Sequence, residues 1–278
     1  MRVTFDSNVW QFVVQPDLAQ KNKSHDDFVI VHEALRSRRI EGFISETVGT
    51  LEGIRCVGRV SYFSSIKPIV DVKTERSGTN ILASVQIGPD HGQHPGLAPV
   101  LQERLNAAFS LGISLMRAAR IGMPVPAPFL NLEHYADEHD VASSAKRDER
   151  TGEVIEAIEL RGVGAAAARN TIKQLYSGTG RKKFLGQSDT FSIAEQNQFS
   201  RDIAEWADGD SIAAHIAYVN DVFCSEDRGK SAGGSSILDE RNRLWLQSTY
   251  GVKFATIQEL ALQLSERMVV LPVQTKPF

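Results

Sequence analysis

The sequence contains few cysteines, no long apolar run and no excess of positive charge. Its two cysteines, Cys56 and Cys224, both lie in apolar surroundings, which predicts buried, reduced thiols rather than a disulfide framework. No stretch approaches the roughly 20 consecutive apolar residues that a membrane-spanning helix needs. Asp6, Ser7 and Asn8 interrupt the N-terminal apolar segment, which excludes the apolar core of a secretory signal peptide. We therefore expect a cytoplasmic protein with no membrane partner.

The charge balance also limits the class of partner. The formal net charge of −3 gives no global basic field of the kind that announces a nucleic-acid-binding protein. Local clusters of Lys and Arg can still contact phosphates, so a nucleic acid stays possible as a substrate. The length of 278 residues and the apolar fraction of 42% are enough for one large domain or two small ones, each with a real core.

The N-terminal part alternates between short strands and helices. The expected elements are a strand at 2–5, a helix after Asp6, a helix from Ser24 to about Arg38, a strand at 42–45 and a helix that Ser45 or Glu46 opens, carrying Val48, Leu51 and Ile54. This order favours a central, mostly parallel sheet covered by helices, the three-layer α/β/α class.

The central part reads as an inserted α+β region. Residues 66–72 and 81–87 look like strands, arranged as a hairpin around residues 76–78. Amphipathic spacing predicts a helix over residues 100–121, and an Ala-rich helix is expected over 164–176. We assign residues 1–60 and 190–278 to a discontinuous core and residues 61–189 to an insertion or elaboration of that core.

The C-terminal part returns to alternating elements. The expected elements are a helix at 193–206, a second helix that Asp210 opens, a strand at 222–224, a helix at 237–250 stopped by Gly251, a strand at 252–256 and a last helix at 257–267. Asp227 then follows a buried strand, as Asp6 does at the start of the chain.

Acidic residues stand at several of these element boundaries. Asp6 and Asp227 follow strands, Asp210 begins a helix, and the third helix adds Glu46 or Glu52. Each acid alone fits a helix cap or a solvated side chain. Together they would repel one another unless a divalent cation bound between them, and Mg²⁺ or Mn²⁺ prefers such oxygen ligands. The combination indicates a metal-assisted phosphodiester hydrolase.

Four segments resemble the PIN-domain nuclease family. VTFDSN resembles its opening strand with Asp and a small polar residue, and ISETVGTLEGI resembles its strand-Ser and helix-Glu segment. DSIAAHIAY followed by VFCSEDRG resembles the Asp-led helix and the strand that ends in Asp, and GVKFATIQEL resembles the closing strand and helix. The resemblance covers both ends of the chain. It implies a PIN-like fold and a Mg²⁺- or Mn²⁺-dependent nuclease that acts on RNA.

The resemblance also implies an acidic set. Asp6, Asp210 and Asp227 would hold the metal directly or through water, and a glutamate would orient or deprotonate the attacking water. The family spacing favours Glu52 as that glutamate, while Glu46 lies next to the strand serine. Two further polar residues complete the set: Asn8 corresponds to the small polar residue beside the first Asp, and Asp208 is an outer acid or a solvated side chain.

Basic residues near these acids could contact the phosphates of the substrate. Arg228 and Lys230 follow Asp227 directly, and a second run consists of Arg181, Lys182 and Lys183. The alternative for this second run is a solvated loop.

These features predict an endoribonuclease, with a toxin-like or RNA-processing role. A toxin–antitoxin setting would add a protein inhibitor or antitoxin as a partner, and the resemblance implies a homodimer. Two alternatives stay open. The first is a non-catalytic scaffold of the same fold that binds RNA or a protein partner, and the second is a structure-specific DNA nuclease.

Overall fold

The computed structural model describes residues 1–54, 68–77, 80–89, 96–118, 131–136, 141–171, 192–229 and 236–269 of the chain. Its strands are β1 (Arg2–Phe5), β2 (Glu41–Ser45), β3 (Pro68–Ser77), β4 (Asn80–Pro89), β5 (Ser114–Met116), β6 (Val222–Cys224) and β7 (Phe254–Ala255). Its helices are α1 (Ser7–Val14), α2 (His25–Arg36), α3 (Thr47–Thr50), α5 (Pro99–Leu111), α6 (Val141–Leu160), α8 (Ile193–Ala217), α9 (Glu240–Tyr250) and α10 (Ile257–Val269). Two 3-10 turns, η1 (Pro16–Ala19) and η4 (Leu132–His134), and a helical segment at 165–171 complete the described elements.

Five strands form one sheet, in the order β5-β2-β1-β6-β7, and all neighbours are parallel. The central strand β1 places Val3 opposite Gly42 of β2 on one side and opposite Val222 of β6 on the other. These pairings confirm the predicted central parallel sheet. The strands of such a sheet are apolar on both faces, so both faces must be covered.

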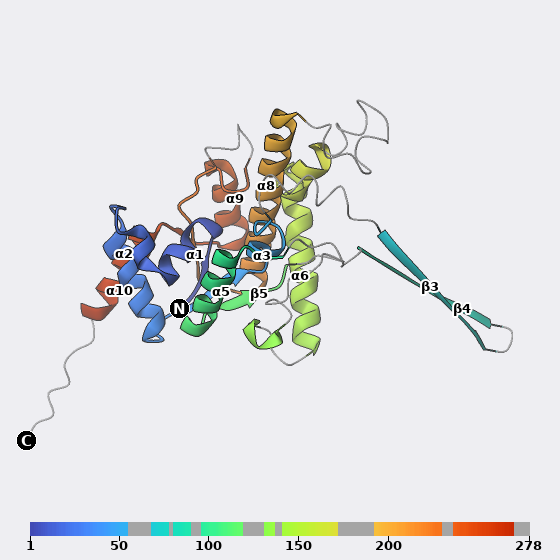
Figure 1. Cartoon of the computed structure of the whole chain (residues 1–278), viewed down its shortest axis with the longest axis horizontal. Helices are drawn as coiled ribbons and strands as arrows, with labels where there is room; N and C mark the ends of the chain where they lie inside the picture. Colours follow the sequence, from blue (N-terminus) through green and yellow to red (C-terminus); the bar gives the residue numbers. More distant parts are fainter. Residues whose placement is uncertain are drawn as a thin grey trace, which may run out of the picture.

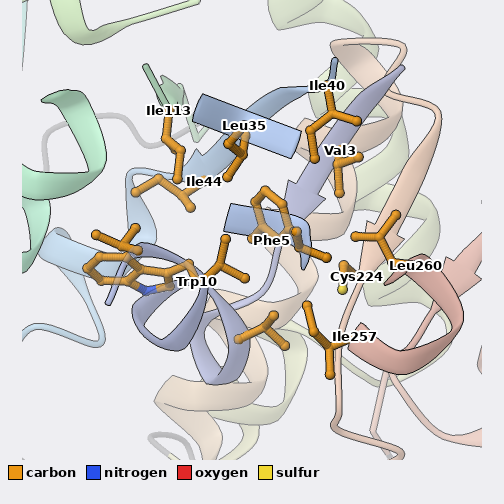
Figure 2. Close-up of a cluster of buried hydrophobic side chains, with 14 of the residues drawn as sticks. Val3, Phe5, Trp10, Leu35, Ile40, Ile44, Ile113, Cys224, Ile257 and Leu260 are labelled. Carbon is orange, nitrogen blue, oxygen red and sulfur yellow. The ribbon is translucent and has the colours of Figure 1, made fainter. Parts of the chain in front are cut away.

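Alternate residues of each strand pack on opposite faces of this sheet. Val3 and Phe5 of β1, together with Cys224 of β6, belong to a core shared with α1, α2, α5 and α10 (Figure 2). Phe223 of β6 belongs to a second core on the other face, shared with α6, α8 and α9. Figure 1 shows these two groups of helices on either side of the sheet, which confirms the three-layer α/β/α class. Cys224 is a buried free thiol as predicted, whereas Cys56 lies outside the described residues.

Helix α8 is attached to the centre of the sheet by a buried polar contact. The Thr4 hydroxyl of β1 lies 2.8 Å from Nδ1 of His215, and Asn220 Nδ2 donates to the same hydroxyl oxygen at 2.8 Å. Burial lowers the pKa of His215 to about 4, so its ring is neutral at pH 7. This contact fixes the position of α8 over the carboxyl end of β1.

The helix predicted over residues 100–121 is wrong in its second half. Helix α5 ends at Leu111, and Gly112 follows with a left-handed φ of 86° that closes the helix. The chain then enters β5, which pairs with β2 as an edge strand of the main sheet. The apolar spacing of this region is compatible with either element, and the glycine decides between them.

The separate helices predicted at 193–206 and from Asp210 are one helix, α8, so Asp210 does not begin a helix. The sequence from Asp208 to Asp210 is typical of a break between two helices, but Gly209 here allows close packing against Gly164. A Cβ at Gly209 would lie 3.0 Å from the Cα of Gly164. The third predicted helix is also shorter than expected, because α3 ends at Thr50 and residues 51–53 form a turn.

The predicted insertion, residues 61–189, contributes directly to the main sheet and its cores. Strand β5 forms one edge of the sheet, and Leu105 of α5 is part of the core around β1. The predicted hairpin is confirmed as the antiparallel pair β3–β4, which Figure 1 shows extending away from the sheet. The Ala-rich helix predicted at 164–176 is seen as far as residue 171, the limit of the described range.

The described residues contain no helix with both the length and the apolarity of a membrane span.

The close packing around Gly42 of β2 allows a test of core packing. A Cβ on Gly42 would lie 2.8 Å from Cδ2 of Leu35, 3.0 Å from Cγ1 of Ile113 and 3.1 Å from Cε2 of Phe5. We expect Gly42→Ala to lower the free energy of unfolding by about 1–3 kcal/mol, measured by urea denaturation, because the core would be overpacked.

The matched control is Gly152→Ala on the exposed side of α6. Among the described atoms, none lies within 4 Å of a Cβ at that position. The control should raise the free energy of unfolding by about 0.5–1 kcal/mol through helix propensity alone. Equal effects of the two substitutions would contradict the tight packing around Gly42.

Candidate acidic site

The carboxyl ends of β1 and β6 lie side by side at the point where the strand order reverses. From β1 the sheet continues through β2 and β5 on one side and through β6 and β7 on the other. In open α/β sheets, ligands bind in the crevice at such a switch point. Asp6 directly follows β1, and its backbone N–H donates to the carbonyl of Cys224 at 3.0 Å. Ser225 and Asp227 follow β6, so the predicted acids Asp6 and Asp227 come to the same edge of the sheet.

The Asp6 carboxylate is 3% exposed and accepts three hydrogen bonds. Its Oδ1 accepts from the backbone N–H of Ser7 at 2.7 Å, as the N-cap of α1. Its Oδ2 accepts from the Ser225 hydroxyl at 2.5 Å and from Asn8 Nδ2 at 2.8 Å. Burial, and to a lesser degree the charge of Asp227, raises the pKa of Asp6, while these hydrogen bonds oppose the rise.

Ser225 joins the two acidic segments. Its hydroxyl donates to Asp6 and accepts from the backbone N–H of Asp227 at 3.0 Å. Asn8 makes a parallel connection, because its Oδ1 accepts from the backbone N–H of Glu226 at 3.1 Å. The sequence prediction included Asn8 but assigned no role to Ser225. Its position directly after a strand that ends near an acid is the signal that could have identified it.

Arg243 of α9 holds the segment that follows Asp227. Its Nη2 donates to the backbone carbonyl of Asp227, and its Nε donates to the carbonyl of Leu238 at 2.8 Å. The Asp227 carboxylate accepts from the backbone N–H of Gly229 at 2.7 Å, which closes a tight turn. These contacts fix the direction in which the Asp227 carboxylate extends from β6.

Arg243 also brings a positive charge to the acids. Partial burial, together with the neighbouring Arg228, lowers the pKa of Arg243, and the charges of Asp6, Asp227 and Glu259 oppose this fall. Sequence reasoning missed Arg243. Its role depends on how α9 lies against the β6 end, and no local pattern reports that placement.

Asp208 of α8 is the acid most strongly affected by the others. Its pKa is raised well above its ordinary value, first by loss of hydration and then by the charges of Asp6, Glu52, Glu205 and Asp227. The charges of Asp6 and Asp227 therefore act on Asp208, which was predicted only as an outer or alternative acid.

Asp210, predicted as a metal ligand, occupies a different side of α8. It lies two residues beyond Asp208, about 200° around a helix of 3.6 residues per turn. Its side chain is 2% exposed. The charges of Asp6 and Asp227 act on Asp208, and the assignment of Asp210 as a metal ligand stays a prediction.

The two candidate glutamates have different surroundings. Glu46 is 8% exposed, and its carboxylate accepts from the backbone N–H of Ala118 at 2.8 Å and from the Tyr135 hydroxyl at 2.9 Å. Glu46 thus holds the segments after β5 in place. Glu52 lies in the turn after α3 and raises the pKa of Asp208. The structure thus links Glu52 to Asp208 through its charge, and links Glu46 to Ala118 and Tyr135 through hydrogen bonds.

Glu205, one turn before Asp208 on α8, was not predicted. Its Oε1 accepts from the backbone N–H groups of Gly164 at 3.0 Å and Ile237 at 2.8 Å. Burial raises the pKa of Glu205, and these hydrogen bonds oppose the rise. These contacts attach the backbone at Gly164 and at Ile237 to α8, which gives Glu205 a structural role.

The chemistry of this group suits a hard divalent cation, although the side chains do not form a complete cage. Among the described residues, no three His, Cys, Asp or Glu side chains already surround one point closely enough to hold an ion. Mg²⁺ commonly takes one or two carboxylates and keeps several waters, so it does not need such a cage. Asp6 and Asp227, with Asp208 or Asp210 of α8, could hold an ion in this mode.

The structure places one of the predicted basic residues. Arg228 is exposed beside Asp227, where it could reach a phosphate. Lys230, Arg181, Lys182 and Lys183 lie outside the described residues.

The raised pKa of Asp208 makes a prediction for stability. Because its folded-state pKa lies above its ordinary value, its contribution to stability is full below pH 4 and is lost as the pH rises through the folded-state pKa. Asn cannot ionise. We expect Asp208→Asn to raise the free energy of unfolding by about 0.5–2 kcal/mol at pH 8 in EDTA, with the gain fading towards pH 4.

Urea denaturation at several pH values measures this effect. The control is Asp148→Asn on the exposed side of α6, which should change stability by no more than about 0.5 kcal/mol at any pH. A loss of stability in Asp208→Asn at pH 8 would show that Asp208 is not repelled by its neighbours.

Comparison of the chain with protein-family models, with curated proteins and with solved structures finds no match. The assignment of a function therefore depends on the geometry of the acidic site and on the motif resemblance.

Proposed function

We propose that the protein is a Mg²⁺- or Mn²⁺-dependent ribonuclease that hydrolyses phosphodiester bonds in RNA. The observation that carries the proposal is the meeting of Asp6 and Asp227, joined through Ser225, at the switch point of the sheet, where the charges of both act on Asp208. These acids come from β1, α8 and the end of β6, and burial and mutual repulsion raise the pKa of both Asp6 and Asp208. Such an arrangement costs stability, so a cation-binding role accounts for it better than a structural one.

In this proposal, Asp6 and Asp227 hold the cation together with an aspartate of α8, either Asp210, as the sequence predicts, or Asp208. A bound Mg²⁺ or Mn²⁺ lowers the pKa of a coordinated water and stabilises negative charge on a phosphoryl oxygen. Ser225 and Asn8 keep the Asp6 carboxylate oriented through their hydrogen bonds. Glu52 orients the attacking water and accepts its proton.

Arg228, which is exposed beside Asp227, contacts the phosphates next to the cleaved bond. Arg243 acts through Asp227, by holding its backbone, and is a positioning residue. The choice of RNA over DNA comes from the PIN-domain resemblance. The same resemblance supports a toxin-like or RNA-processing role, an inhibitor or antitoxin as partner, and a homodimer.

Cleavage of a single-stranded RNA in Mn²⁺ tests the proposal. We expect Asp227→Asn to slow cleavage by about 10²–10³-fold, because it removes negative charge that holds the cation. Asp148→Asn is the matched control and should cleave at the rate of the unaltered protein. Full activity of Asp227→Asn would contradict the proposed site, and cleavage of DNA in preference to RNA would contradict the substrate.

Metal binding can be measured without any cleavage. We expect saturating Mn²⁺ to stabilise the unaltered protein by about 2.7 kcal/mol at 100 times the dissociation constant, since the ion binds the folded state alone. The stabilisation should be much smaller in Asp227→Asn, and in the Asn variant of whichever aspartate of α8, Asp208 or Asp210, holds the ion. Thermal unfolding with and without Mn²⁺ measures it, and equal stabilisation of the unaltered protein and Asp227→Asn would place the ion elsewhere. Asp6 is less suitable for substitution because it caps α1.

A further inference from the structure

The hairpin β3–β4 forms a second sheet of its own. Its strands pair over their whole length, from Pro68 opposite Pro89 at the base to Ser77 opposite Asn80 at the turn. Among the described strands it pairs with no other, and Figure 1 shows it extending away from the five-stranded sheet. A two-stranded hairpin alone in water is marginally stable, and further strands or a helix against an apolar face are needed to stabilise it.

The register divides the residues of the hairpin between two unlike faces. Residues directly opposite each other in an antiparallel pair share a face, and successive residues of a strand alternate between faces. The face that we call the apolar face carries the pairs Val70–Ile87, Val72–Val85, Thr74–Ala83 and Arg76–Ile81. The polar face carries the pairs Ile69–Gly88, Asp71–Gln86, Lys73–Ser84 and Glu75–Leu82.

The apolar face limits the kind of surface that can cover it. Its one charged residue, Arg76, lies next to the turn, so the rest of the face needs an apolar partner surface of about 20 Å in length. Elsewhere in the described part of the chain, no element exposes more than one large apolar residue. The surface that matches the apolar face in both length and chemistry is the same face of a second copy.

The area of the apolar face is sufficient for such a contact. Full burial of a Val or Ile is worth about 1.5–3 kcal/mol, which corresponds to about 60–120 Å² of apolar surface. The face carries five such residues, so two copies packed face to face would bury about 1,000 Å² in all. Specific interfaces begin at about this size.

We propose that the apolar face of the hairpin is a dimer interface, which packs against the same face of a second copy of this chain. The contact is isologous, because a twofold axis brings the same residues together from both copies. Asp71, Lys73 and Glu75 remain in water on the outer, polar faces. The interface is independent of the proposed nuclease function. It is also independent of the motif resemblance, which covers only the two ends of the chain.

Sedimentation equilibrium of the full chain measures this association. We expect a dimer with a dissociation constant in the micromolar range, as suits an interface at the lower end of the usual sizes. Val85→Lys places a charge in the centre of the apolar face and should raise the dissociation constant by about 30-fold or more. The matched control, Gln86→Lys, places the same charge one residue further on, opposite Asp71 of the polar face, and should leave the dissociation constant unchanged.

A second substitution separates loss of the interface from loss of the hairpin. Val72→Thr keeps the β-branched shape and the strand preference but adds a hydroxyl, so it should raise the dissociation constant by about tenfold with the hairpin intact. A protein that stays monomeric far above the micromolar range, or a dimer that Val85→Lys and Val72→Thr leave unchanged, would overturn the proposal. Equal weakening by Val85→Lys and Gln86→Lys would place the contact at the edge of β4 and would also overturn it.

Discussion

The parallel pairing of β1 with β6 is the constraint on which the acidic site depends. Phe5 lies opposite Cys224 in this register, so the next residues, Asp6 and Ser225, leave the sheet side by side. A slip of one residue would turn every side chain of β6 to the other face and separate the hydroxyl of Ser225 from Asp6. The register is strongly specified because Phe223 and Cys224 pack into different cores.

Electrostatic repulsion among the acids is offset by a small number of fixed donors. The N–H of Ser7, the amide of Asn8 and the hydroxyl of Ser225 all point at one carboxylate. Arg243 adds a positive charge at the edge of the group. Loss of hydration, followed by the charges of Asp6, Glu52, Glu205 and Asp227, raises the pKa of Asp208 on α8.

Local patterns were sufficient to predict the strands that carry the site. β1 and β6 are short apolar segments followed by polar residues, and both end within one residue of the prediction. The helix break expected before Asp210 was wrong because Gly209 serves the contact with Gly164, which no local pattern encodes. The same limit explains the missed role of Arg243.

Which glutamate belongs to the site stays a prediction. Glu46 and Glu52 are equally acidic in sequence, and the resemblance favoured Glu52. The two glutamates differ in their contacts, because the Tyr135 hydroxyl and the backbone N–H of Ala118 donate hydrogen bonds to the Glu46 carboxylate. Tyr135 lies far along the chain from Glu46, so composition and periodicity alone could not have shown this contact.

The distance along the chain between the two halves of the site has a consequence for biosynthesis. Ser225 lies 219 residues after Asp6, and β6 must dock beside β1 before the two can meet. Contacts of such long range are slow to form, because they close a long loop at a cost in entropy. A nascent polypeptide still attached to the ribosome, or one released early by premature termination, therefore carries Asp6 without its partners, and the complete set of acids exists only in finished molecules.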